Sequence, residues 1–383
     1  MEGETFKLGI IRNSTKYLSV NHYNLQELGL AQELVDLGFE VDVYYANNKN
    51  IEEQIRYNNK VKIVYLRVRQ LIAQQGVFIN LFKFLKSNNY TVIQVSEDSS
   101  IQSVIVGVWC KLNNVPMVLW QGMYQEYNET RHKLIQRVYD ILFLPILRKC
   151  TSAVICKTKF AEDYIVKKRF KNTFVIPVGF DSNKLHSNLN QKRPDSLNSI
   201  DTTKDIILFV GRLIDDKNPF FILDLAAHYS NNSDVQFVIV GKGKYEELVK
   251  KRIAEISKDI IYIPQLEQKE LGYLYNVSKL FLMPSTVEIY GMVYIECMSF
   301  GLPVISLYNA GANSILRSGR DSYVMEQLDL SKWIEKIDFL ISNKVEYEKM
   351  RFNLKSRVYE FNWNTLAPKY FEVYGSVIKE RIH

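Results

Sequence analysis

The chain alternates short apolar runs with stretches of helical spacing, and it does so in two successive blocks. The first block has apolar runs at 7–11, 40–45, 61–66, 92–95, 115–120, 153–156 and 173–176. The second block has them at 205–210, 235–240, 260–263, 280–283 and 304–306. Strands that alternate with helices build parallel sheets covered by helices, so the pattern predicts an α/β protein.

A polar stretch at 182–204, rich in Asn, Ser and Lys, separates the two blocks. We interpret it as a linker between a first domain at 1–181 and a second domain at 205–362. A chain of 383 residues is long enough for two cores of ordinary size. Each block is predicted to be a doubly wound, Rossmann-like domain, and the two domains are expected to face a cleft. The tail at 363–383 carries large apolar residues at helix spacing, which predicts a final helix.

Composition narrows the classes of function. The 4 cysteines form no Cys-x-x-Cys pair and have no metal-ligand spacing, which favours packed free thiols and a reducing compartment. The net charge of +7 is spread along the chain, and no zinc-finger spacing, basic heptad region or RNP-like aromatic motif is present, so nucleic acid is not expected as a partner. The acidic start, Met1 to Thr5, does not resemble a signal peptide, and a cytoplasmic location is expected.

One segment invites a membrane interpretation. The residues at 131–149 mix Lys and Arg with many aliphatic side chains, but Pro145 and the Arg148-Lys149 pair interrupt the apolar run, so no membrane span is predicted. The segment could lie at the interface of a membrane, which would place the protein peripherally at the inner face. A helix that packs its apolar side into the domain is the favoured interpretation, because most amphipathic helices face a core.

The stretch at 284–303 carries the clearest functional signal. It follows the apolar run at 280–283 and contains Glu288 in a loop, a turn at Tyr290-Gly291 and a helical pattern from Met292 that includes Glu296. A helix N-terminus offers unpaired N–H groups and a positive dipole, so the loop suits an anionic or hydroxyl-rich ligand. The alternative is an exposed loop charge followed by an exposed helix charge.

Two further loops follow strands of the second block. Gly211, Arg212 and Lys217 come directly after the run at 205–210, and an Arg and a Lys five residues apart can bring two positive charges to one diphosphate. Gly241 and Gly243 follow the run at 235–240. A Gly-x-Gly alone is weak evidence, and a plain turn is the default interpretation of this second loop.

These motifs occur together in the order of a known family. The spacing from Glu288 to Glu296 resembles the Glu-x7-Glu signature of retaining glycosyltransferases of the GT-B fold, of the type called glycosyltransferase family 4. The resemblance implies that Arg212 and Lys217 neutralise a nucleotide diphosphate, with Gly211 beside them. It further implies that Glu288 and the backbone of Tyr290, Gly291 and Met292 hold the sugar, that Glu296 holds the ribose, and that Gly241, Gly243, Gln265 and Leu266 lie at the nucleotide.

The first block departs from the family in two places. Gln121, before Gly122, stands where relatives often have a His that supports the reaction centre, and an amide cannot exchange protons near neutral pH. Gln121 is therefore a candidate catalytic or acceptor-binding residue whose role as an acid or base is in doubt. In place of a glycine-rich loop after the first strand, the chain has Asn13 and Ser14, which we take as acceptor-side candidates along with Gly122.

The resemblance implies transfer of a sugar from a UDP- or GDP-sugar to a glycan, a lipid-linked glycan or another hydroxyl acceptor, in surface polysaccharide or glycoconjugate synthesis. Retention of configuration is expected, and no metal or other cofactor is required. Two alternatives stay open. One is a nucleotide-sugar 2-epimerase of the same fold, and the other is a catalytically silent protein that binds carbohydrate or stabilises a partner enzyme.

Overall fold

The computed structural model describes residues 6–19, 25–47, 52–71, 75–126, 130–181, 185–186, 193–257 and 259–382. It divides into two compact units. The first unit comprises Met1–Phe180 together with Asn362–His383, and the second unit comprises Asp181–Phe361. The predicted tail is thus part of the first unit, and Met1 to Thr5 lie outside the described residues.

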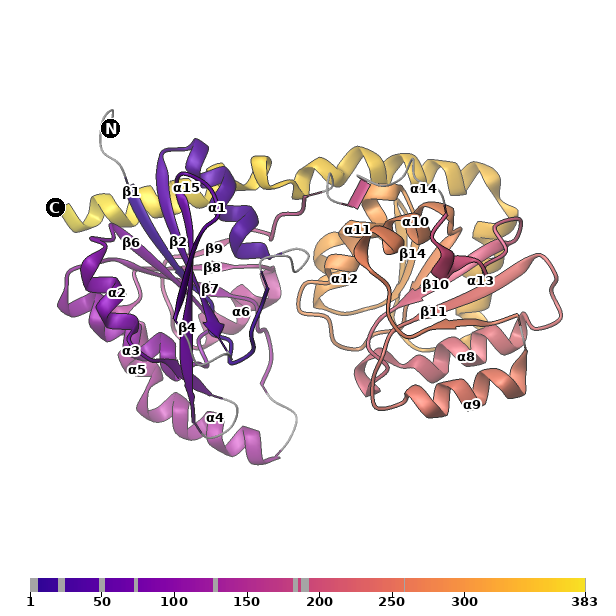
Figure 1. Cartoon of the computed structure of the whole chain (residues 1–383). Coiled ribbons are helices and arrows are strands. Elements are labelled where there is room, and N and C mark those ends of the chain that lie inside the picture. The colour runs from indigo at the N-terminus through magenta and orange to yellow at the C-terminus, as the bar shows by residue number, and fades with distance from the viewer. Residues whose placement is uncertain are drawn as a thin grey trace. The chain divides into compact units, whose positions relative to one another are not determined.

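The first unit is built on a mostly parallel sheet with helices on both faces (Figure 1). The sheet order is β3-β4-β2-β1-β6-β7-β8-β9, and β5 pairs with β4. Only β3 and β5 run antiparallel among the described strands, both of them against β4. The strands are β1 (Phe6–Ile11), β2 (Phe39–Asn47), β3 (Glu53–Arg56), β4 (Val61–Gln70), β5 (Gly76–Phe78), β6 (Val92–Ser96), β7 (Met117–Gln121), β8 (Ala153–Cys156) and β9 (Thr173–Val175).

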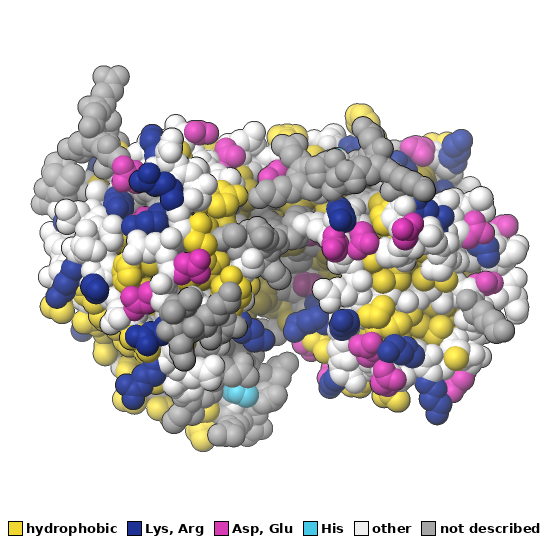
Figure 2. Space-filling model, in the orientation of Figure 1, with side chains coloured by type: hydrophobic (Ala, Val, Ile, Leu, Met, Phe, Trp, Pro, Cys, Tyr) yellow, Lys and Arg dark blue, Asp and Glu magenta, His cyan; other side chains and the backbone are white. Residues whose placement is uncertain are grey.

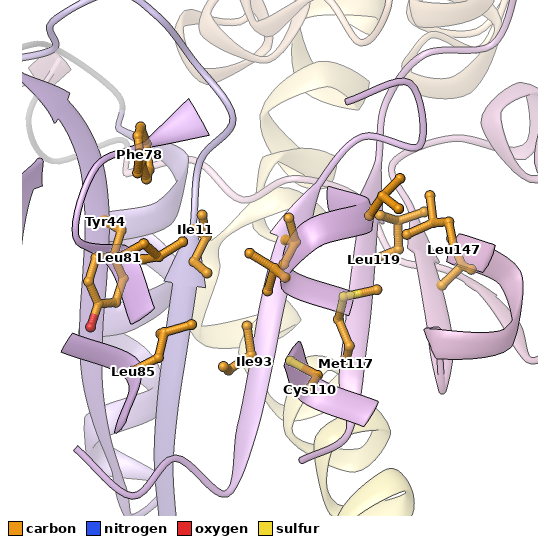
Figure 3. Packing of buried hydrophobic residues seen from close by; sticks show 14 of the residues in the cluster. Ile11, Tyr44, Phe78, Leu81, Leu85, Ile93, Cys110, Met117, Leu119 and Leu147 are labelled. Atoms are coloured by element: carbon orange, nitrogen blue, oxygen red, sulfur yellow. The ribbon is translucent and has the colours of Figure 1, made fainter. Parts of the chain in front are cut away.

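The helices of the first unit cover this sheet and bury its apolar side chains. They are α1 (Gln26–Asp36), α2 (Leu81–Ser87), α3 (Ile101–Leu112), α4 (Thr130–Leu142), α5 (Leu144–Cys150), α6 (Lys159–Lys167) and α15 (Trp363–Ile382). Figure 3 shows one face of the core, where Ile93 and Leu119 of the sheet meet Leu81 and Leu85 of α2 and Leu147 of α5. Burial of this kind contributes about 1.5–3 kcal/mol for each large aliphatic side chain.

The cysteines lie in apolar surroundings, as predicted. Cys110, Cys156 and Cys297 are buried, Cys150 is half-buried, and all four are free thiols. Burial raises the pKa of Cys156 to about 12, so this thiol stays protonated at neutral pH.

The second unit has a fully parallel sheet among its described strands. The order is β12-β11-β10-β13-β14-β15, from β10 (Asp205–Val210), β11 (Val235–Val240), β12 (Ile261–Ile263), β13 (Leu280–Met283), β14 (Val304–Leu307) and β15 (Ser322–Met325). Its helices are η2 (Asp195–Leu197), η3 (Asp215–Lys217), α8 (Pro219–His228), α9 (Glu246–Ile256), α10 (Gln268–Val277), α11 (Met292–Phe300), α12 (Ala310–Ile315), α13 (Leu330–Ser342), α14 (Lys344–Arg357) and η4 (Val358–Phe361). The predicted α/β class and doubly wound topology are confirmed for each unit.

Part of the predicted linker is packed rather than free. Residues 193–204 belong to the second unit, where Leu197 and Ile200 are buried and the guanidinium of Arg193 donates to the carbonyls of both. The stretch looked like a linker because its polar residues outnumber these two apolar anchors. Residues 182–184 and 187–192 lie outside the described part of the chain.

The first unit is completed by the return of the chain at α15. Phe180 and Asn362 are bridged by backbone pairing, so the chain leaves and re-enters the first unit at one place. The indole of Trp363 then occupies a slot between two glycines. A Cβ at Gly29 would lie 2.1 Å from this indole and a Cβ at Gly179 would lie 2.2 Å from it, so both positions require glycine for this packing.

Candidate functional site

Two loops meet where the strand order of the second unit reverses. From β10 the chain builds β11 and β12 on one side, and it then returns to place β13 on the other side of β10. The loop after β10 and the loop after β13 therefore leave neighbouring parallel strands at the same edge of the sheet. In open α/β sheets, ligands bind at this point.

Hydrogen bonds join the two loops directly. The backbone N–H of Thr286 donates to the carbonyl of Asp216 at 2.9 Å, and the hydroxyl of Ser285 donates to the same carbonyl at 3.0 Å. The side-chain amide of Asn218 donates to the carbonyl of Pro284 at 2.8 Å. Asn218 has a φ of 46°, a left-handed conformation that Asn tolerates better than most residues. The loops thus form one structural element.

Lys217 is the centre of this element. Its ammonium donates to the hydroxyl of Ser285 at 3.0 Å and to the carbonyl of Val287 at 3.1 Å, and it forms an ion pair with Glu288. The Lys217 side chain is 9% exposed and that of Glu288 is 16% exposed. The structure therefore brings together two predicted site residues, but as a buried pair in which the carboxylate already balances the ammonium.

Arg212, in contrast to Lys217, is exposed and has no ion-pair partner among the described residues. It follows β10 on the same loop and is exposed, and within the described part of the chain its side chain makes no hydrogen bond or ion pair. A guanidinium keeps its charge at any physiological pH and can bind phosphate oxygens in pairs. The loop thus presents one uncommitted positive charge beside a compensated one.

The predicted glycines explain how the loops after β10 and β11 can touch. Gly241 has a φ of 148°, and a Cβ there would lie 1.8 Å from the carbonyl oxygen of Gly211. A Cβ at Gly243 would lie 2.3 Å from the carbonyl oxygen of Leu213. The backbone N–H of Leu213 donates to the carbonyl of Lys242 at 2.9 Å. Both glycines are therefore required by backbone-to-backbone packing, whatever ligand the loops hold.

The loop after β13 ends in the predicted helix start. Gly291 has a φ of 79° and precedes α11, which begins at Met292 as expected from the sequence. The N–H of Gly311 in α12 donates to the carbonyl of Glu288 at 3.1 Å. A Cβ at Gly311 would lie 2.5 Å from the carbonyl of Tyr290, so this glycine permits α12 to support the loop. Asn313, farther along α12, is exposed.

Glu296 lies one turn into α11 and is almost completely buried, with 8% of its surface exposed. One of its carboxylate oxygens accepts a hydrogen bond from the hydroxyl of Tyr275 on α10, at 2.8 Å. Tyr275 thus orients the carboxylate, which the sequence alone could not indicate. The alternative interpretation of Glu296 as an exposed helix charge is wrong.

Gln265 and Leu266 follow β12 at the same edge of the sheet. Gln265 is exposed and its side-chain carbonyl accepts a hydrogen bond from Lys242 at 3.3 Å, while Leu266 is half-buried. The bond connects the loop after β12 to the glycine loop after β11.

In the first unit, the side chain of Gln121 is buried and hydrogen-bonded to neighbouring residues. It is fully buried at the end of β7, and its amide carbonyl accepts from the N–H of Asp98 at 2.9 Å. Its amide nitrogen donates to the Asp98 carboxylate and to the carbonyl of Met123, each at 3.0 Å. Direct contact with a substrate would require these bonds to open, so a catalytic role for Gln121 stays a prediction.

The other acceptor-side candidates are also engaged within the first unit. The amide of Asn13 donates to the hydroxyl of Ser103 at 2.7 Å, and its carbonyl oxygen is buried without a partner among the described residues. Ser14 forms a local turn with Lys16. The backbone N–H of Gly122 donates to the carboxylate of Glu97, at 3.2 Å and 3.3 Å to its two oxygens. Glu97 lies two residues after the end of the predicted strand at 92–95, so its position near a strand end was the signal that could have identified it.

Within the described residues, no group of three or more His, Cys, Asp or Glu side chains is arranged to hold a metal ion.

Comparison with known proteins finds similarity to glycosyltransferases. Residues 192–358 match the family model described as "Glycosyl transferases group 1". The chain is 24% identical over 285 residues to an Escherichia coli UDP-Gal:alpha-D-GlcNAc-diphosphoundecaprenol alpha-1,3-galactosyltransferase, with 72% of each chain covered. It is 22% identical to a 2-deoxystreptamine N-acetyl-D-glucosaminyltransferase of Niallia circulans, with 92% of this chain and 97% of that protein covered.

Solved structures show the same architecture at low identity. Anabaena HepE in complex with UDP superposes with a TM-score of 0.76 at 15% identity, covering 97% of this chain and 100% of that one. The sucrose-phosphate synthase of Thermosynechococcus elongatus superposes with a TM-score of 0.73 at 17% identity, covering 98% and 100%.

Proposed function

We propose that the chain is a glycosyltransferase of the group 1 family, whose model matches residues 192–358, and that it transfers the sugar of a UDP-sugar to a hydroxyl acceptor with retention of configuration. The observation that carries the proposal is the arrangement of Arg212, Lys217 and Glu288 on the two joined loops at the switch point of the second unit. UDP is proposed as the nucleotide because it is bound in HepE and named in the donor of the Escherichia coli relative.

The diphosphate is proposed to bind at Arg212 first, because this guanidinium is exposed and uncommitted. A phosphate group near Lys217 would then compete with Glu288 for the ammonium. The exchange would leave the Glu288 carboxylate able to accept hydrogen bonds from the sugar's hydroxyls. The two positive charges would stabilise the leaving diphosphate as its charge grows in the transition state, without a metal ion.

Glu296 is proposed to accept hydrogen bonds from the ribose hydroxyls. The hydroxyl of Tyr275 occupies one of its carboxylate oxygens, at 2.8 Å, and fixes the orientation of the group. A carboxylate has about four lone-pair positions and can accept several hydrogen bonds at once.

The proposed reaction forms one bond and breaks one. The acceptor oxygen attacks the anomeric carbon from the face that the diphosphate leaves, and the bond between that carbon and the β-phosphate oxygen breaks. The acceptor proton passes to the departing diphosphate oxygen. The product then has the anomeric configuration of the donor.

The stereochemistry is tested by NMR of the product formed from a UDP-α-sugar and an alkyl glycoside. An α-linkage supports the proposal, and a β-linkage would refute retention. The donor site is tested by thermal stabilisation with UDP, GDP, ADP and CMP. We expect a shift with UDP that Arg212→Ala removes and that Arg320→Ala, an exposed arginine of the same unit, leaves intact. Loss of the UDP shift in both variants would refute the role of Arg212.

The acceptor is proposed to be a glycan carried on a membrane lipid, in surface polysaccharide synthesis, which places the enzyme peripherally at the cytoplasmic face of the membrane. The Escherichia coli relative acts on a diphosphoundecaprenol-linked sugar by its name, and another relative, from Klebsiella pneumoniae, comes from a "cps region". No helix in the described part of the chain is long and apolar enough to cross a membrane.

The surface of α4 supports this location and corrects the favoured interpretation of its sequence. Leu134, Ile141 and Leu142 are 64%, 73% and 57% exposed, whereas Gln136 and Tyr139 on the opposite face are buried. The helix therefore has an apolar face directed away from the core. Figure 2 shows hydrophobic side chains mixed with Lys and Arg at the lower edge of the first unit, where α4 and α5 lie in Figure 1. Exposed Lys133, Arg137 and Lys149 complement anionic lipid headgroups.

Co-sedimentation with vesicles tests the membrane contact. We expect binding to phosphatidylglycerol-containing vesicles, which the double substitution Leu134→Asn and Ile141→Asn abolishes. Phe352→Asn, an exposed apolar residue of the second unit, serves as the matched control. Equal binding of the double variant and the control would contradict the role of α4.

A further inference from the structure

The first unit has its own switch point, and a charged cluster lies there. From β1 the chain builds β2 and β4 on one side and then places β6 on the other side of β1. Arg12 follows β1 and Glu97 follows β6. Lys157 follows β8, two strands farther along. These side chains therefore leave the carboxyl edge of one parallel sheet, where α/β folds bind ligands.

Glu97 is held in an unusual conformation by specific bonds. Its φ of 65° is left-handed, which costs a residue other than Gly or Asn strain. Its carboxylate accepts from two consecutive backbone N–H groups, that of Gly122 and that of Met123, the latter at 3.1 Å. The backbone N–H of Glu97 donates to the carbonyl of Trp120 at 3.0 Å. The surroundings thus fix both the backbone and the carboxylate.

Lys157 is fixed just as firmly. Its ammonium lies 4.4 Å from the ring centroid of Trp120 and donates to the side-chain carbonyl of Gln26 at 3.1 Å. Burial lowers the pKa of Lys157, against the opposing effects of Glu97 and Glu27. Burial likewise raises the pKa of Glu97, against the opposing effect of Lys157. The two charges therefore interact electrostatically in surroundings of low polarity.

Glu97 and Lys157 nevertheless form no ion pair within 4.0 Å among the described contacts. Each keeps its own partners, so the Glu97 carboxylate is an acceptor and the Lys157 ammonium is a donor that are not in direct contact with one another. Nearby, Arg12 is bound to Glu27 by two bonds of 3.0 Å, and the hydroxyl of Tyr45 donates to Glu27 at 3.2 Å. The two positive charges of Arg12 and Lys157 are thus balanced by the negative charges of Glu97 and Glu27. This balance disfavours an anionic ligand.

A hydroxyl group suits this arrangement because it can donate and accept at the same time. We propose that Glu97 and Lys157 form the subsite for a hydroxyl of the acceptor sugar, which donates to the Glu97 carboxylate and accepts from the Lys157 ammonium. The inference rests on the proposed function and deepens it by naming acceptor-binding residues that the motifs did not include. Asn13, whose buried side-chain carbonyl has no partner in the described structure, lies on the same loop as Arg12.

Acceptor kinetics test the subsite. Wild type, Glu97→Gln and Lys157→Met are compared with UDP-glucose or UDP-galactose as donor and with octyl glycosides of glucose, galactose and N-acetylglucosamine as acceptors. Asp163→Asn, an exposed carboxylate on α6, is the matched control. We expect kcat/KM for the octyl glycoside to fall at least tenfold in the first two variants, which corresponds to about 1.4 kcal/mol. The KM for the UDP-sugar and the thermal shift with UDP stay within twofold of wild type.

The other outcomes distinguish failure of the subsite from failure of the proposed function. A kcat/KM for the octyl glycoside within twofold of wild type in Glu97→Gln overturns the subsite. A loss that affects donor and acceptor alike, with a lowered melting temperature, shows a structural role and also overturns it. If the wild type binds UDP but uses no octyl glycoside, the assignment to a sugar hydroxyl fails while the donor site stands. If no UDP binds, the proposed function fails, and the subsite fails with it.

Discussion

The buried Lys217 and the exposed Arg212 lie on one loop, so substituting each should separate stability from ligand binding. In Lys217→Met the Glu288 carboxylate is left without its ion-pair partner, and Ser285 and Val287 lose a hydrogen-bond donor. Removing one partner of a buried ion pair costs about 3–5 kcal/mol. Because Glu288 is 16% exposed, water recovers part of this, and we expect about 3 kcal/mol.

In thermal unfolding the two variants should differ clearly. A loss of about 3 kcal/mol lowers the melting temperature of a unit the size of Asp181–Phe361 by roughly 6–12 °C. Arg212→Met removes an exposed side chain without a described partner and should change stability by less than about 0.5 kcal/mol. UDP at 100 times its dissociation constant stabilises wild type by about 2.7 kcal/mol, and Arg212→Met should lose this gain.

A second substitution isolates the pair itself. Adding Glu288→Gln to Lys217→Met removes the uncompensated carboxylate and should restore about 1 kcal/mol, within the roughly 0.5–3 kcal/mol coupling seen for residues in contact. Melting of Lys217→Met within 2 °C of wild type would refute the burial and pairing described for this lysine. A large stability loss in Arg212→Met would refute its description as uncommitted.

Three further predictions follow from other contacts. Gly241→Ala should cost at least about 2 kcal/mol, because its Cβ would meet the carbonyl of Gly211, whereas Gly375→Ala, in an open helical position, should stabilise by up to about 1 kcal/mol; urea unfolding of both variants checks the opposite signs. Trp363→Ala should cost about 3–5 kcal/mol, and unchanged unfolding would contradict the packing of its indole. Burial raises the pKa of Glu97 in the folded state, so its contribution to stability is greatest below the unfolded pKa and is lost as pH rises through the folded pKa. The stability of Glu97→Gln relative to wild type should therefore increase from pH 4 to pH 8 in melting experiments. A constant difference between the two proteins would contradict the raised pKa.

The sequence predicted most of the strands because they are buried on both faces. The run at 205–210 is the whole of β10, and 280–283 is the whole of β13. Three strands at sheet edges escaped prediction: β3 and β5, which lie beside β4, and β15, which ends the sheet of the second unit. There β3, with the sequence EQIR, is largely exposed and lacks an apolar pattern.

The site was predictable as a set of loops but not as a set of contacts. Spacing placed Lys217 and Glu288 at strand ends, and the parallel topology brings those ends together. The left-handed turn at Asn218, whose amide donates to the carbonyl of Pro284, joins the same two loops, and no spacing reveals it. Gln121 was expected at a substrate, but β6 lies beside β7 and brings Asp98 within reach of its amide.

The bridge between Phe180 and Asn362 has a consequence for how the protein folds. The second unit is the uninterrupted segment Asp181–Phe361, so it can fold in a chain whose first unit still lacks α15. Without Trp363, the slot lined by Gly29 and Gly179 stays open to water. A chain truncated after Phe361 should therefore contain a protease-resistant second unit and a protease-sensitive first one.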